Sequence, residues 1–420
     1  MPLFTHGQSG ESRLAMPGNE GGVAEMEKRG MTCGMAGGRS LNGNTVAPWR
    51  RLLRLLLVLP AMACAWAFAS PVEDCDRMAA DPLDPLRQSK GVFYGDIAMP
   101  DALEACSKAV ESQPDNARLA YQYGRTLLNA GREAEAVEWI GKAATAGHSQ
   151  AYLELGMHEE VDKGRHGSAF AYFMMAAQLG HVPAMTLIGR AYQNGRGVLV
   201  DSTSALAWLR QAAQLGDTEA QVLVGIYYFN GIGVIEDMRE AAGWFSMVGD
   251  ADPYAMMFLG SMYLYGTGVG KDEARAFGLF RKAAGKGASM AMAVVGELYL
   301  DGNGVARDEE EGLRWLRKAH ERGEAYGSVR LGSALLGKAN DDEARKEGLK
   351  ILLEAAEGGN AEAAERLWSV YHHGDGVTAD ERKARRWMTE FKRLDGESGS
   401  SPGTDEPSRS QRWPSGPEAA

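Results

Sequence analysis

Three short motifs in this 420-residue chain contain residue types that carry chemistry in many proteins. Gly266-Thr267-Gly268-Val269-Gly270-Lys271 is a glycine-rich run ending in lysine, as phosphate-binding loops do. His158-Glu159-Glu160 begins like the helical motif of zinc proteases. His372-His373 stands beside Asp375, and histidine with carboxylate can bind a metal ion. If functional, these motifs would bind nucleotide phosphates or a transition metal.

None of these motifs meets the full requirement of its chemistry. A Walker phosphate loop needs a glycine where this chain has Tyr265, and a Ser or Thr where it has Asp272. A zinc-protease helix needs a second histidine four residues after the first, which His158 lacks. No nucleophile has a recognisable base beside it. The sequence therefore predicts no catalytic residue, no metal site and no cofactor, and it favours a solvated turn for His372-His373.

The glycine-rich run and the histidine pair fall at the same point of a repeated pattern. Its anchor residues are separated by 36, 35, 36, 36 and 36 residues: Gly189, Gly225, Gly260, Gly296, Gly332 and Trp368. Regular self-similarity at this period predicts stacked helix pairs, because one pair cannot bury its apolar face alone.

Each repeat has a turn whose residue types fit a helix–turn–helix. In the copy at Gly189, Tyr192 ends one helical face, Gly195-Arg196-Gly197-Val198 interrupts it, and Asp201 precedes a second helix. The first glycine suits a left-handed helix end. The aspartate can accept hydrogen bonds from the free amides of the next helix.

This pattern, A-x-x-x-[LIV]-G-x-x-Y-x-x-G-x-G-V-x-x-D-x-x-x-A-x-x-W, resembles the Sel1-like repeat (SLR) family of the tetratricopeptide-repeat (TPR)-like superfamily. The resemblance covers residues 184–394, although the copy at Gly332 lacks the Gly-x-Gly-Val turn and the last copy has Trp368 at the anchor. Residues 117–183 hold two shorter units, similar to ordinary TPR units. The resemblance implies an all-α fold, a right-handed α-α superhelix (solenoid) of about eight antiparallel helix pairs, and a role in protein–protein interaction.

Helical geometry places three positions of each first helix opposite its core side: three before, one after and four after the anchor. We call these the groove positions. They are polar in the outer copies and largely apolar in the middle ones. Because first helices line the concave face in solenoids of this type, we expect a partner-binding concave groove. Its predicted residues are Val222, Ile226, Phe229, Met257, Leu264, Glu297, Leu300 and Val329. The alternative is that these side chains pack on each other.

The chain ends have other compositions. Arg50, Arg51 and Arg54 precede an apolar run that ends in Ala67-Phe68-Ala69, which predicts a signal peptide at 50–69 cleaved between Ala69 and Ser70. The protein would then be exported, periplasmic or secreted; the alternative is that the same segment stays uncleaved as a membrane anchor. Residues 1–49 lack periodicity and are expected to be disordered; a start codon assigned too early would explain this extension. The tail, 395–420, is also expected to be disordered.

Two cysteines, Cys75 and Cys106, remain after the predicted cleavage, and an even pair in an exported chain favours a disulfide. The alternative is two buried thiols. The disulfide would fasten a cap at residues 70–116 to the first repeat.

The net charge of the chain bears on whether its partner is a protein or a nucleic acid. Residues 1–69 hold 7 of the 45 Lys and Arg and 4 of the 56 Asp and Glu, which leaves the rest with a net charge of −14. Such an acidic chain argues against nucleic acid. The sequence thus predicts an exported, non-enzymatic scaffold or adaptor with protein partners. The alternative is a carbohydrate- or peptidoglycan-binding envelope factor, disfavoured because most aromatic residues occupy repeat-core positions.

Overall fold

The fold is taken from a computed structural model that describes residues 70–161, 164–338 and 340–397. This part of the chain contains eighteen α-helices, one short 3₁₀ helix and no β-strand. The helices are α1 (Pro71–Ala79), η3 (Tyr94–Asp96), α2 (Asp101–Ser112), α3 (Ala117–Asn129), α4 (Glu133–Thr145), α5 (Ser149–Val161), α6 (His166–Gln178), α7 (Val182–Asn194), α8 (Ser202–Gln214), α9 (Thr218–Asn230), α10 (Met238–Val248), α11 (Pro253–Tyr265), α12 (Glu273–Gly285), α13 (Ser289–Asp301), α14 (Glu309–Glu321), α15 (Ala325–Leu336), α16 (Asp342–Glu357), α17 (Ala361–His373) and α18 (Glu381–Glu397).

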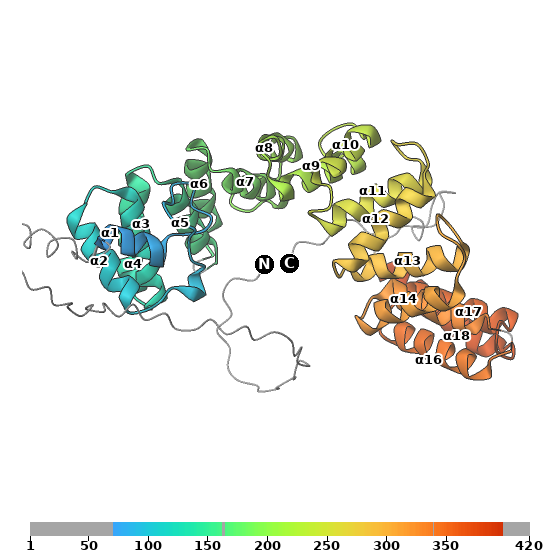
Figure 1. The fold of residues 1–420 in the computed structure, drawn as a ribbon. Helices are drawn as coiled ribbons and strands as arrows, with labels where there is room; N and C mark the ends of the chain where they lie inside the picture. Colours follow the sequence, from blue (N-terminus) through green and yellow to red (C-terminus); the bar gives the residue numbers. More distant parts are fainter. Residues whose placement is uncertain (1–69, 162–163, 339, 398–420) are drawn as a thin grey trace, which may run out of the picture. The chain divides into compact units, whose positions relative to one another are not determined.

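The helices from α3 onward form eight successive pairs, as the repeat period predicts. Each odd-numbered helix packs on the even-numbered helix that follows it, and each even-numbered helix packs on the next pair (Figure 1). We call the odd-numbered helices from α3 to α17 the A-helices and their partners, α4 to α18, the B-helices. This arrangement confirms the all-helical TPR-like solenoid.

The turn between the two helices of a repeat has the predicted caps. Gly195, which ends α7, has φ +70°, and the corresponding Gly231 at the end of α9 has φ +65°. The Asp201 side chain accepts hydrogen bonds from the backbone amides of Thr203 and Ser204 at the start of α8. The repeat around Gly332 differs as expected, since α15 ends at Gly337 with an ordinary φ of −69°.

The anchor glycine lets the A-helix and B-helix of one pair approach closely. A β-carbon added at Gly225 would lie 2.5 Å from Cε1 of Phe245, a ring that is fully buried between the two helices. At Gly189 the same carbon would lie 2.6 Å from Cγ of Leu209. Any larger residue at these anchors would therefore push the pair apart.

The second glycine of the turn makes a contact between repeats that the sequence analysis missed. A β-carbon on Gly233 would lie 2.7 Å from the backbone carbon of Ser202, at the start of the B-helix one repeat earlier. A β-carbon on Gly268 would overlap the carbonyl oxygen of Met238, again one repeat earlier. Both glycines also have positive φ. The second glycine is thus required both by its backbone conformation and by close backbone packing.

The N-terminal cap consists of α1, α2 and the segment between them. Cys75 on α1 and Cys106 on α2 are both fully buried, and their sulfur atoms lie 2.05 Å apart, at bonding distance. Residues 80–97, which we call the N-terminal strap, connect the two helices and contact α3 and α5 (Figure 1).

Several predicted features fall at or beyond the edges of the described residues. The N-terminal extension at 1–49 and the predicted signal peptide at 50–69, with Ala69, lie outside them. Ser70 is described, and its side chain caps α1 by accepting a hydrogen bond from the amide of Glu73. The last helix, α18, continues to Glu397, three residues into the segment predicted as tail. Among the described residues, no helix is both long and apolar enough to span a membrane.

Candidate functional site

The apolar residues of the predicted groove lie partly or wholly inside the stack. Met257 and Val329 are only 6% and 2% exposed. The others are half-buried and pack against the core clusters of the stack: Val222, Ile226, Phe229, Leu264 and Leu300. A partner would reach the edges of these side chains, and their use in binding stays a prediction.

Phe229 shows how the groove positions are supported by the next repeat. Its ring contacts that of Phe258 edge-on at a centroid distance of 5.3 Å, and Phe258 stacks on Phe245 at 5.0 Å. The three rings come from α9, α10 and α11, so they connect neighbouring pairs. Edge-to-face aromatic contacts of this kind add stability beyond their buried area.

Glu297 is the polar member of the predicted groove, and it is held by ion pairing across two repeats. Arg330 on α15 lies 2.8 Å from Glu297 on α13 and 3.4 Å from Glu362 on α17. The Tyr326 hydroxyl donates a hydrogen bond to Glu297. Burial raises the pKa of Glu297, although the Tyr326 hydrogen bond and the Arg330 charge oppose this shift. Glu297 was predicted from the sequence, but its partners Arg330 and Tyr326 were not.

In the first unit, the groove positions are already occupied by the N-terminal strap. Tyr121 and Arg125 stand three before and one after the anchor Gly124, and both are almost completely buried. The Tyr121 hydroxyl donates a 2.8 Å hydrogen bond to the Asp81 carboxylate of the strap. The Arg125 guanidinium donates to the strap carbonyl of Val92 at 3.1 Å and to the carbonyl of Ala79, the last residue of α1, at 2.7 Å. These groove positions therefore bind an irregular segment of the same chain.

A second row of contacts lies at the start of α5 and α7. The Asp84 carboxylate and His148 are both fully buried, with Oδ2 and Nε2 3.2 Å apart. His148 Nδ1 accepts a hydrogen bond from the Ala151 amide. Gln150 donates to Asp81 at 3.4 Å and lies 2.6 Å from the ring of His181.

The strap contacts were not predicted, because the sequence contains only a weak signal for them. The strap carries the acidic, proline-containing stretch Asp81-Pro82-Leu83-Asp84-Pro85. The first unit has Tyr121 at a groove position where the middle units have apolar residues, and Arg125 where the unit at Gly225 has Ile226. A polar groove position opposite an acidic segment is compatible with contact. Nothing in the repeat period places the two together.

The chemical motifs considered first take structural roles. Gly266 ends α11 with φ +73°, the Gly266 and Thr267 amides donate to the carbonyl of Met262, and Lys271 pairs with Glu273 at 2.8 Å. The exposed His372 lies 3.2 Å from Glu381. Within the part of the chain that the structure describes, no cluster of three His, Cys, Asp or Glu side chains is arranged to bind a metal ion.

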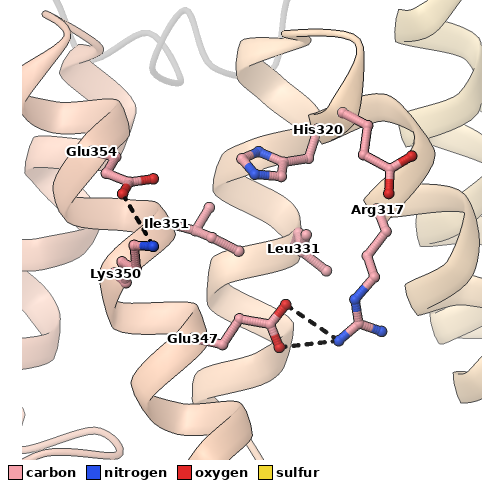
Figure 2. Close-up of a pocket in the computed structure, with 8 residues that line it drawn as sticks. Arg317, His320, Leu331, Glu347, Lys350, Ile351 and Glu354 are labelled. Carbon is pink, nitrogen blue, oxygen red and sulfur yellow. Dashed lines mark hydrogen bonds and ion pairs between the residues drawn. The ribbon is translucent and has the colours of Figure 1, made fainter.

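A shallow pocket of about 220 Å³ lies between α14, α15 and α16, away from the groove positions (Figure 2). Its charged groups pair with each other: Arg317 lies 3.1 Å from Glu347, and Lys350 lies 3.7 Å from Glu354. Leu331 and Ile351 form its floor. Because Arg317 and Lys350 are matched by neighbouring carboxylates, the pocket has no surplus positive charge with which to bind an anionic ligand.

Comparison with known families matches the same repeats. The Sel1 repeat family matches six segments: residues 149–181, 182–217, 218–250, 253–287, 289–324 and 362–394. The first of these lies where anchor spacing suggested ordinary TPR units, and a tetratricopeptide repeat family matches residues 105–138. None of the six covers the unit around Gly332, which lacks the Gly-x-Gly-Val turn.

Two solved structures resemble the chain closely enough to support the fold. A protective antigen of uropathogenic Escherichia coli strains, which displays an SLR fold, is 27% identical with a TM-score of 0.60; the match covers 71% of this chain and 64% of the antigen. This chain thus spans just under two thirds of that protein's length. A Sel1 repeat protein from Oxalobacter formigenes is 26% identical with a TM-score of 0.52, covering 57% of this chain and 96% of that one. No curated protein matches the chain.

Proposed function

The chain is a Sel1 repeat protein of the TPR-like superfamily. From this premise we propose that it is an exported, non-enzymatic scaffold, which binds protein partners through the groove positions of its A-helices. Repeat proteins of this kind bind partners on surfaces assembled from successive units. The proposed partners are proteins rather than nucleic acid, because the chain from Ser70 onward carries a net charge of −14.

The occupied groove positions of the first unit carry this proposal. Tyr121 and Arg125 bind the Asp81 carboxylate and the Val92 carbonyl of the N-terminal strap, and Arg125 also binds the carbonyl of Ala79 at the end of α1. Hydrogen bonds to main-chain carbonyls can hold an irregular segment, while side-chain contacts add specificity. The same register positions continue through α7 to α17.

Two observations support the exported location. The signal-like segment at 50–69 precedes the first described helix, and Cys75 and Cys106 are placed at bonding distance. A structural disulfide persists in oxidising compartments and is rare in reducing ones. A carbohydrate-binding role receives less support, because the groove ring of Phe229 packs edge-on against Phe258 rather than presenting an open face.

The direct test is partner capture with a variant of the middle groove. We expect Ile226→Gln with Phe229→Gln to abolish capture of proteins cross-linked to the tagged mature chain in the exported compartment. The half-buried positions imply a stability loss of about 2–4 kcal/mol, so capture is compared at a temperature where circular dichroism shows both chains folded.

The matched control variant also carries two apolar residues replaced by glutamine, but on the B-helix side. Leu215 and Met247 are 58% and 61% exposed, so Leu215→Gln with Met247→Gln should leave capture unchanged. Loss of capture in the control, or full capture by the folded groove variant, would contradict binding through the groove positions.

A further inference from the structure

The N-terminal strap inserts two acidic side chains into the stack and leaves three large apolar ones outside, although Ile97 at its end is buried. Asp81 and Asp84 are 8% and 0% exposed, whereas Leu83, Leu86 and Phe93 are 70%, 49% and 65% exposed. This is the reverse of the usual pattern for a segment that belongs to a hydrophobic core. The contact with the A-helices is therefore chiefly a recognition of two carboxylates and the adjoining backbone.

The groups that surround these carboxylates form a site that selects for acidic segments. Tyr121, Gln150 and Arg125 all approach Asp81: the first two donate hydrogen bonds, and the guanidinium lies 3.7 Å away. His148 Nε2 lies 3.2 Å from Oδ2 of Asp84. A neutral segment in this place would leave these buried donors without acceptors, which is costly.

The spacing and backbone of the strap define the segment that fits. The two carboxylates are three residues apart, and each is followed by proline, in the order Asp81-Pro82-Leu83-Asp84-Pro85. Proline restricts the residue before it to extended conformations. The site thus fits an irregular, non-helical segment of the form Asp-Pro-x-Asp.

The strap is held both by its own contacts and by its connections to α1 and α2. The exposed leucines contribute little to docking, so the contacts of the two carboxylates and the adjoining backbone must carry most of it. The two flanking helices, joined where Cys75 meets Cys106, keep the strap beside its site at an effective concentration of about 1 mM. A segment of the same chemistry from another protein can therefore compete for the site.

We propose that the strap is a built-in occupant of a peptide-binding site, and that the partner of this site is an extended acidic segment carrying Asp-Pro-x-Asp, which displaces the strap. This inference rests on the proposed use of groove positions and names the chemistry that the first unit recognises. The strap then limits access to the site, so that only a partner that supplies both aspartates opens it.

The test uses a fluorescent synthetic peptide with the sequence of residues 79–93 and the complete mature chain. In a strap-loosened chain carrying Asp81→Asn and Asp84→Asn, we expect the peptide to bind at least about tenfold more tightly than to the wild-type chain, because the competing strap is weakened. A peptide with asparagine at both aspartates should not bind. Tyr121→Phe in the strap-loosened chain should weaken binding severalfold, since it removes one donor and keeps the ring.

Equal binding of the aspartate and asparagine peptides, or no binding to a folded strap-loosened chain, would overturn the proposal. If the strap-loosened chain does not fold, hydrogen exchange on the wild-type chain decides. Excess aspartate peptide should speed exchange of the Val92 amide, which donates to Ala80 in the docked strap, and unchanged exchange would overturn the proposal. Because Ile226 and Phe229 lie on α9, outside the strap contacts, their capture experiment tests the proposed function separately.

Discussion

Replacing Gly268 by alanine should weaken the stack at one defined turn, while replacing Gly270 in the same turn should not. Gly268 has φ +69°, and a β-carbon there would overlap the carbonyl oxygen of Met238. Gly270 has no atom within 4 Å of its would-be β-carbon and no positive φ. The two glycines lie in the same loop but differ in φ and in the space available for a β-carbon, which are the two features expected to decide the stability of the stack.

The expected magnitudes follow from these two features. A left-handed conformation costs an L-residue about 1–2 kcal/mol, and overpacking against backbone costs about 1–3 kcal/mol more, so Gly268→Ala should lower the free energy of unfolding by about 2–5 kcal/mol. Gly270→Ala reduces the conformational entropy of the unfolded chain without a clash in the folded one. It should therefore be neutral or raise the free energy of unfolding by up to about 1 kcal/mol.

Urea unfolding followed by circular dichroism at equilibrium measures both variants against the wild-type chain. Because each unit of a solenoid contacts only its neighbours, the transition of the Gly268→Ala variant should also broaden as the stack divides at this turn. Equal effects of the two substitutions would refute the reasoning, since they would show that the close backbone approach between repeats contributes nothing.

The remaining predictions concern the N-terminal part of the chain. Cys106→Ser should lower the free energy of unfolding by about 3–4 kcal/mol, and in exported wild-type protein mass spectrometry should find both cysteines protected from alkylation until a reductant is added; free thiols would contradict the disulfide. Burial lowers the pKa of His181 in the folded chain below the ordinary value of 6.5, so below that pH the unfolded chain binds more protons than the folded chain. The stability that this histidine contributes above about pH 6.5 should be lost progressively as the pH falls through the lowered pKa, and His181→Gln should reduce the fall in melting temperature; an unchanged fall would assign it to other groups.

The repeat period made most of the fold predictable. Glycine at position 195 and aspartate at position 201 each have one local role, the helix end and the helix start, and local roles can be deduced from residue type. The role of Gly268 was harder to predict from the sequence. Its contact is with Met238, in the previous repeat, and depends on how closely successive helix pairs stack. The family match to residues 149–181 likewise includes a unit whose shorter spacing made it resemble an ordinary TPR.

The candidate site was predicted only in part. Helical geometry assigned Ile226 and Phe229 to one face, but it could not show that Phe258 would support that face from the next repeat. The contacts of the strap could not be predicted from the sequence for a different reason. Asp81 and Tyr121 are 40 residues apart, and their contact is polar, so neither hydrophobic periodicity nor local capping signals it. Buried polar contacts between distant segments have no periodic signature in a single sequence.

The most direct test of binding through the groove positions is site-specific photo-crosslinking in living cells. Gln193 on α7 occupies a groove position and Gln211 on α8 faces outward on a B-helix; both are exposed glutamines, so a photoreactive residue can replace either with little disturbance. The account predicts that the residue at 193 captures one dominant protein, identified by mass spectrometry, and that the residue at 211 does not. Capture of the same protein from position 211 alone would contradict the account and place the binding surface on the B-helices.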